Sequence, residues 1–135
     1  MSKFLERAKE LRANTERHYN CAQAVLIPFA EAAGMDHETA YRLAANFASG
    51  MKRGSTCGAI TGGLMALGLY GLETPADIQL YHQRLRAQHQ NMLDCADLLA
   101  AWVAAGNKDK KPHCDAMVYE CVTLCEALLR EKGKL

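Results

Sequence analysis

The sequence predicts an all-α protein: a single-domain bundle of about six to seven helices packed around a buried glycine-rich helix. Apolar residues recur at helical spacing along most of the 135 residues, and strand-type alternation is absent. Residues 54–72 carry no charge and contain six glycines, which favours a helix buried on all sides. We expect one domain over residues 1–135, because a chain of this length can bury its own core.

The first two helices are expected at residues 2–14 and 20–34. The first is amphipathic, with apolar residues on one face and charged residues on the other. The second begins at Asn20, because Asn20 and Gln23 have the spacing of a capping box. In that arrangement each side chain bonds the backbone amide of the other residue, which defines the start of the helix.

The next three helices also begin at recognisable signals. Asp36 is a favoured N-cap and starts a third helix, which is expected to stop at Gly50. A tight loop then leads into the fourth, glycine-rich helix at Thr56. Thr74 followed by Pro75 predicts the start of the fifth helix, because proline is favoured at the first helical position.

Two helices are expected in the last third of the chain. Asp94 begins a sixth helix that ends near Gly106, and a seventh helix is expected from about His113 to Glu131. Residues 107–112 lie between them and contain three lysines and a proline, which favours a surface loop.

Charge and composition narrow the class of protein. Sixteen basic and fifteen acidic side chains give a net charge of +1, which does not favour a nucleic-acid partner or a membrane surface. The N-terminus lacks the apolar core of a signal peptide, so we expect a cytoplasmic protein without a membrane span. In that compartment, six cysteines are more often catalytic, redox-active or metal-binding than a disulfide framework.

Four of the six cysteines directly follow a residue at an expected helix start. The positive end of the helix dipole favours a thiolate over a thiol, and the thiolate is the form that attacks disulfides and binds soft metals. We therefore expect Cys57 to act as a nucleophile, with one of the other three as its resolving partner. The four dipeptides are Asn20-Cys21, Thr56-Cys57, Asp94-Cys95 and His113-Cys114.

The fourth helix carries small residues on one face. Gly58, Ala59 and Gly62 would let another backbone approach closely, and their amides could bind an anion, so they are candidate cofactor-binding residues. The alternative is tight packing against another helix, either within the chain or in a second copy as a homo-oligomer. Lys52 and Arg53, just upstream of Cys57, could lower the pKa of its thiol.

The remaining cysteines and two histidines allow more than one interpretation. Cys121 and Cys125 share a helix face with Cys114 and are expected to be small apolar core residues. His18 and His113 lie close to Cys21 and Cys114 in sequence, so each could be a base, a metal ligand or an ordinary loop residue.

Three classes of function remain open at this point. The chain has no Cys-x-x-Cys pair, which argues against a thioredoxin-like site and against a zinc ribbon. The first class is thiol–disulfide exchange or electron transfer without a bound cofactor. In the second, Cys21, Cys57, Cys95 and Cys114 bind a metal ion or an iron–sulfur cluster. The third is a structural or partner-binding bundle whose cysteines only pack.

The cysteine pattern also resembles that of a known family. The sequence Cys57-Gly58-Ala59-Ile60-Thr61-Gly62 is similar to the Cys-Gly-Ala-x-x-Gly motif of redox-active proteins of the C_GCAxxG_C_C type, and an apolar helix follows it. Cys21, Cys95 and Cys114 match the other three signature cysteines, and the resemblance covers about residues 15–129. It implies a redox role and a redox or electron-transfer partner of unknown identity.

Overall fold

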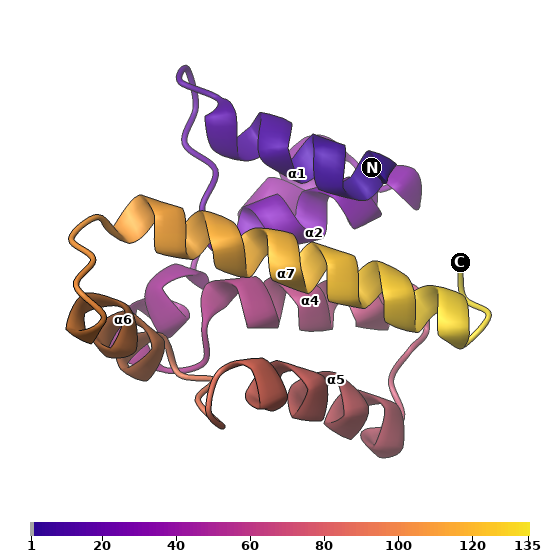
Figure 1. Ribbon diagram of the computed structural model, residues 1–135. Coiled ribbons are helices and arrows are strands. Elements are labelled where there is room, and N and C mark those ends of the chain that lie inside the picture. The colour runs from indigo at the N-terminus through magenta and orange to yellow at the C-terminus, as the bar shows by residue number, and fades with distance from the viewer. Residues whose placement is uncertain (1) are drawn as a thin grey trace.

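The computed structural model describes residues 2–135. These residues form seven α-helices and one π-helical turn without a β-strand, which confirms the all-α prediction (Figure 1). The elements are α1 (Lys3–Ala13), α2 (Cys21–Ala32), α3 (His37–Ala44), the turn η1 (Gly50–Gly54), α4 (Gly58–Leu69), α5 (Pro75–Gln88), α6 (Cys95–Ala104) and α7 (Lys110–Glu131).

Helix α4 lies at the centre of the bundle. It packs against both α2 and α7, which also contact each other, while α1 covers α2 and α7 (Figure 1). Eight of its twelve residues are buried, as expected for an uncharged glycine-rich helix. Within residues 2–135, no helix combines the length and the apolar character required to cross a membrane.

Helix α2 is anchored at its start by the predicted capping box. The Gln23 amide donates to Asn20 Oδ1 and the Asn20 amide donates to Gln23 Oε1, both at 2.8 Å. The same two side chains donate to the end of α3, from Asn20 Nδ2 to the Ala45 carbonyl and from Gln23 Nε2 to the Tyr41 carbonyl. Helix α3 therefore ends at Ala44, and its expected extension to Gly50 is wrong, because its last carbonyls bond α2 side chains.

The small residues of α4 allow α2 to approach closely. A Cβ atom at Gly62 would lie 2.6 Å from the carbonyl oxygen of Ala22, which is backbone and cannot move aside. At Gly63 it would meet the hydroxyl of Tyr81 and, at 2.9 Å, the sulfur of Cys125. Residues of the same chain therefore pack against the glycine face of α4, so this face is not available to a second copy.

Helix α7 begins earlier than the sequence indicated. Asp109 is its N-cap, and the helix starts at Lys110, three residues before the expected start at His113. Pro112 is compatible with this position, because the amides of the first turn have no partner within a helix. Cys114 is therefore the fifth residue of its helix, and its expected placement at a helix start is wrong.

Candidate functional site

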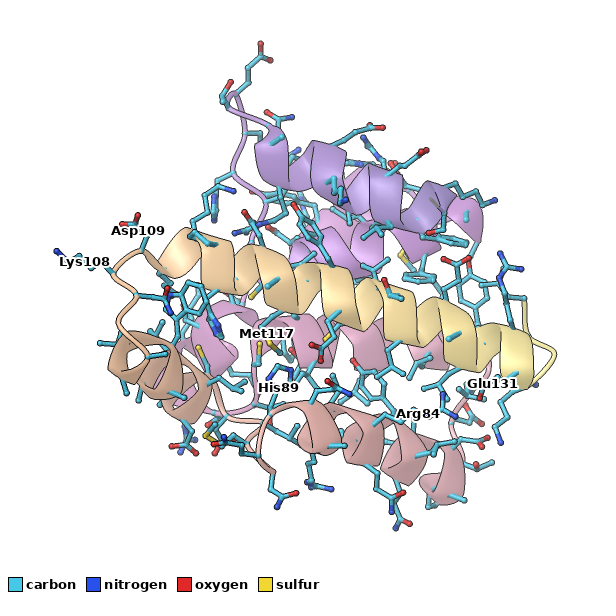
Figure 2. The ribbon with its side chains drawn as sticks, in the orientation of Figure 1. Arg84, His89, Lys108, Asp109, Met117 and Glu131 are labelled. Carbon is cyan, nitrogen blue, oxygen red and sulfur yellow. The ribbon has the colours of Figure 1, made fainter. Side chains whose placement is uncertain are left out.

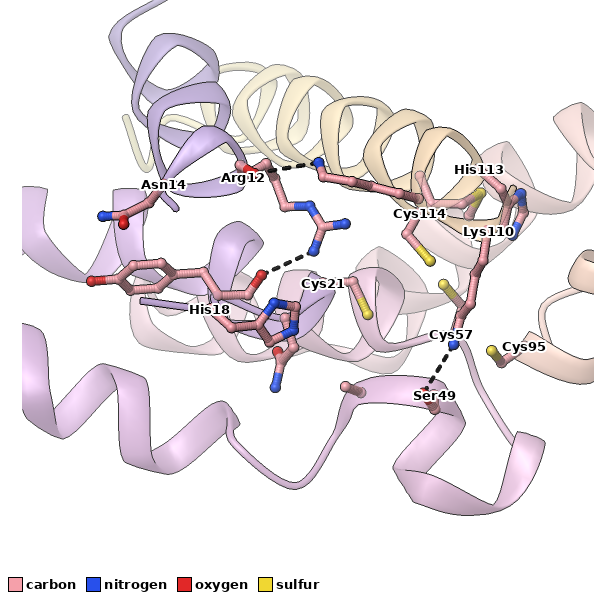
Figure 3. A pocket seen from close by; sticks show the side chains of 15 residues that line it. Arg12, Asn14, His18, Cys21, Ser49, Cys57, Cys95, Lys110, His113 and Cys114 are labelled. Atoms are coloured by element: carbon pink, nitrogen blue, oxygen red, sulfur yellow. Dashed lines mark hydrogen bonds between the residues drawn. The ribbon is translucent and has the colours of Figure 1, made fainter. Parts of the chain in front are cut away.

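The structure brings the four signature cysteines to one cavity. Cys21, Cys57, Cys95 and Cys114 all line a space of about 400 Å³, and Figure 3 shows their side chains on its wall. Cys21 and Cys57 are 8% and 6% exposed, whereas Cys95 and Cys114 are half-buried. His18 and His113 also line the cavity.

A short backbone link holds the starts of α4 and α6 side by side. Thr56 and Asp94 form an isolated antiparallel β-bridge. The Cys57 amide donates to the Leu93 carbonyl at 2.9 Å, and the Cys95 amide donates to the Ser55 carbonyl at 2.7 Å. Cysteines that are 38 positions apart in the sequence are thereby placed at adjoining helix N-termini.

Cys21 is the first residue of α2 and lies against the start of α4. A Cβ atom at Gly58 would lie 2.5 Å from the Cys21 sulfur, so the sulfur occupies the space that glycine leaves beside Cys57. Burial raises the pKa of Cys57, Cys95 and Cys114, and the nearby Cys21 thiol raises each further. Cys21 is thus close enough to the other three signature thiols to raise the pKa of each.

Burial, not the helix dipole, controls the ionisation of Cys57. Cys57 is the N-cap of α4, and the amides of Ala59 and Ile60 favour its thiolate. Desolvation outweighs those amides and raises the pKa of Cys57 to about 12. The expectation of a lowered pKa at this thiol is therefore wrong.

Three cations that the sequence did not identify line the cavity that holds the thiols. Arg12, Lys110 and Lys111 are its lining cations, and none of the acidic residues in the described range 2–135 lines it. Arg12 pairs with Asp115 at 2.6 Å, and Lys111 pairs with the same carboxylate at 2.9 Å. Lys110 lowers the pKa of Cys95 and Cys114, although burial has the larger, opposite effect.

No local pattern could have identified these cations, because Arg12 and Lys110 are almost a hundred positions apart. The basic residues that the sequence did indicate, Lys52 and Arg53, do not line the cavity. Lys52 instead donates to Asn46 Oδ1 at 3.0 Å.

The candidate cofactor residues of α4 pack against protein. Gly58, Ala59 and Gly62 are buried and do not line the cavity. Gly58 and Gly62 face the sulfur of Cys21 and the backbone of Ala22, respectively. Their observed role is close helix packing, and a role in cofactor binding stays a prediction.

The alternative of a metal site has no geometric counterpart among residues 2–135. No three side chains of His, Cys, Asp or Glu in this range lie together as a metal ion would need. All six cysteines are free thiols. Ligation of a metal ion or cluster by the four signature cysteines therefore stays a prediction.

Cys121 and Cys125 belong to the hydrophobic core and do not line the cavity. Both are fully buried, and Cys125 Sγ donates to the Gly63 carbonyl at 3.6 Å. The neighbouring Tyr81 hydroxyl donates to the Ile60 carbonyl at 3.0 Å. These positions agree with the expected packing role of the two cysteines.

Burial predicts the order in which five of the six thiols react with iodoacetamide. A pH of about 8 lies far below the pKa of Cys57, which burial raises to about 12, so nearly all of this residue is the unreactive protonated thiol. We expect Cys95 and Cys114 to be labelled at least about tenfold faster than Cys57, and Cys121 and Cys125 only after unfolding. Peptide mass spectrometry against time measures this order, and rapid labelling of Cys57 would contradict it.

The fold and the cavity together define a class of protein, a small helical domain whose four spaced cysteines share one site. Residues 19–128 match the family model described as "Putative redox-active protein (C_GCAxxG_C_C)". This match spans most of the chain, so the protein belongs to that family of redox-active proteins, as the cysteine motif had suggested. Neither a curated protein nor a solved structure matches the chain.

Proposed function

We propose that the protein is a thiol–disulfide redox protein in which Cys21 and Cys57 form the exchanging pair. The observation that carries this proposal is the position of the Cys21 sulfur, which lies against Gly58, the residue after Cys57. Family membership supports redox activity, and the shared cavity supports a reaction among these thiols.

Cys21 is the better candidate for the first attack on an incoming disulfide. Cys21 is the first residue of α2 and lines the cavity. Burial raises the pKa of Cys57, so this thiol stays protonated near neutral pH. Cys57 then resolves the mixed disulfide, because it lies next to the Cys21 sulfur. Cys95 and Cys114 line the same cavity and offer alternative partners to Cys21.

The proposed pair can be tested by counting thiols before and after oxidation. We expect a small disulfide to lower the number of titratable thiols in the unfolded protein from six to four. Peptide mapping should then identify one Cys21–Cys57 crosslink, which requires two Cα atoms within about 7 Å. The variants Cys21→Ser and Cys57→Ser should each lack this crosslink.

Cys125→Ala is a suitable control, because Cys125 lies outside the cavity and the variant keeps all four signature cysteines. Its thiol count should fall from five to three. Six persistent thiols in the oxidised wild-type protein, or a crosslink that lacks Cys21 or Cys57, would contradict the proposed pair.

A further inference from the structure

We propose that the cavity binds a small anionic disulfide, and that Lys110 binds a carboxylate of this substrate. This inference rests on the proposed function and adds the class of substrate. Its basis is the shape of the cavity, the excess of positive charge around it and the position of the Lys110 ammonium group.

The cavity has the size of a small-molecule site. Its volume of about 400 Å³ lies within the range of about 300–1,000 Å³ that is usual for such sites. The two thiols of the proposed pair are less than a tenth exposed. Because both thiols are so little exposed, we expect a slender molecule to reach them more easily than a disulfide on the surface of a folded protein.

The charges around the cavity favour an anion. Arg12, Lys110 and Lys111 line the cavity, and within residues 2–135 the carboxylate that pairs with Arg12 and Lys111 is that of Asp115, which does not line it, so positive charge is in excess along the lining. Arg12 is only 7% exposed, and it also donates to the Tyr19 carbonyl at 2.9 Å, which keeps its guanidinium in place. In Figure 3 the head groups of Arg12 and Lys110 approach the thiols from two sides.

Lys110 is the cation best placed to bind substrate. Its ammonium group donates to Ser49 Oγ at 3.2 Å, a neutral partner, and within residues 2–135 no carboxylate pairs with it. Ser49 adopts a left-handed backbone conformation with φ of 53°, which is unfavourable for a residue other than glycine. A substrate carboxylate could replace the weak hydroxyl partner and gain an ion pair.

The two protein thiols and the bound disulfide are the only reactants that the exchange requires, and no cofactor takes part. The Cys21 thiolate attacks one sulfur of the bound disulfide, which forms a mixed disulfide and releases one thiolate product. Cys57 loses its proton to solvent and attacks the Cys21 sulfur, which forms the protein disulfide and releases the second product. Each product takes up a proton, so two electrons pass from the protein to the substrate.

Three small disulfides of similar length and different charge test the inference. The probes are the dianionic 3,3′-dithiodipropionate, the neutral bis(2-hydroxyethyl) disulfide and the dicationic cystamine. Each rate of protein oxidation is divided by the rate of the same reagent with a free small thiol, which removes differences in intrinsic reactivity. At low ionic strength we expect the anionic probe to react about tenfold faster than the neutral one, and the cationic probe to react slowest. About 1 M salt should reduce these differences.

Two lysine variants separate a specific contact from general charge. Lys110→Gln should reduce the normalised rate of the anionic probe about three- to tenfold and leave that of the neutral probe within about twofold. Lys108→Gln is the matched control, because it removes the same charge two residues before Lys110, just outside α7. Lys108 does not line the cavity and points to solvent in Figure 2. Equal effects of the two variants would overturn the role of Lys110.

Suberate, an unreactive dicarboxylate of the same chain length as dithiodipropionate, supplies a readout that needs no redox step. It should raise the Tm of the wild-type protein and of the Lys108→Gln variant but not that of Lys110→Gln. If all three disulfides oxidise the protein at equal normalised rates and suberate has no effect, the anionic substrate is overturned while the redox function stands. If suberate stabilises the protein but no disulfide oxidises it, the proposed redox function is wrong. A disulfide is then also not the ligand of the cavity.

Discussion

The free energy of unfolding is expected to fall steeply between pH 9 and pH 11 under reducing conditions. Burial raises the pKa of Cys57 and Cys125 to about 12, and that of Cys121 well above its usual value of 9.0. The unfolded chain loses these protons near pH 9, whereas the folded protein retains them. The stability that comes from burying neutral thiols is therefore complete below pH 9 and is lost as the pH rises toward 12.

The expected slope follows from the number of buried thiols. Each thiol contributes a loss of about 1.4 kcal/mol per pH unit within this window, so three contribute about 4 kcal/mol per unit. Between pH 9 and pH 11 the loss is about 8 kcal/mol, which is comparable to the total stability of about 5–15 kcal/mol for a domain, so most of the stability should be gone by pH 11. Urea unfolding followed by circular dichroism at several pH values measures the slope.

The variant Cys125→Ala isolates one thiol in this experiment. Its stability at pH 7 can differ from that of the wild-type protein, but its slope above pH 9 should be shallower by about 1.4 kcal/mol per pH unit. Identical slopes in the two proteins would show that the buried thiols do not control alkaline unfolding.

The helices that the sequence predicted well are those with short-range start signals. The capping box at Asn20 and the Thr74-Pro75 pair depend on residues within a few positions of each other, and α2 and α5 begin at these signals. The limits of α3 and α7 depend on other parts of the molecule. Helix α3 stops where Asn20 bonds the Ala45 carbonyl, and α7 extends through a lysine-rich segment with a proline, which resembles a loop.

The candidate site likewise has features that the sequence predicts and features that depend on the rest of the fold. Four helix-associated cysteines could be selected from the sequence, and the structure places all four around one cavity. Their ionisation could not be predicted, because a helix start favours the thiolate whereas burial opposes it, and burial is a property of the folded bundle. The cations Arg12 and Lys110 were missed because only the packing of α1 beside α7 brings them to the thiols.

Replacing Gly62 with alanine is expected to destabilise the protein, although alanine favours helix formation. The new methyl group would lie 2.6 Å from the Ala22 carbonyl oxygen and 3.0 Å from the Ala22 Cα, so α2 and α4 would have to move apart. Overpacking of this kind costs about 1–3 kcal/mol, and the collision with backbone favours the upper end. The gain of about 1 kcal/mol in helix propensity offsets part of this, so we expect a net loss of about 1–2 kcal/mol.

Gly68→Ala is the matched control for this substitution, because Gly68 lies in the same helix and no atom comes within 4 Å of a Cβ atom placed there. It should raise the free energy of unfolding by up to about 1 kcal/mol, since only the helix propensity changes. Separation of α2 from α4 also moves Cys21 relative to Cys57, so Gly62→Ala should slow formation of the proposed disulfide while Gly68→Ala leaves its rate unchanged. Equal stabilities of the two variants would show that close packing of α2 on α4 is not what requires glycine at position 62. A Gly62→Ala protein that is destabilised but forms the disulfide at the wild-type rate would separate the helix packing from the redox site.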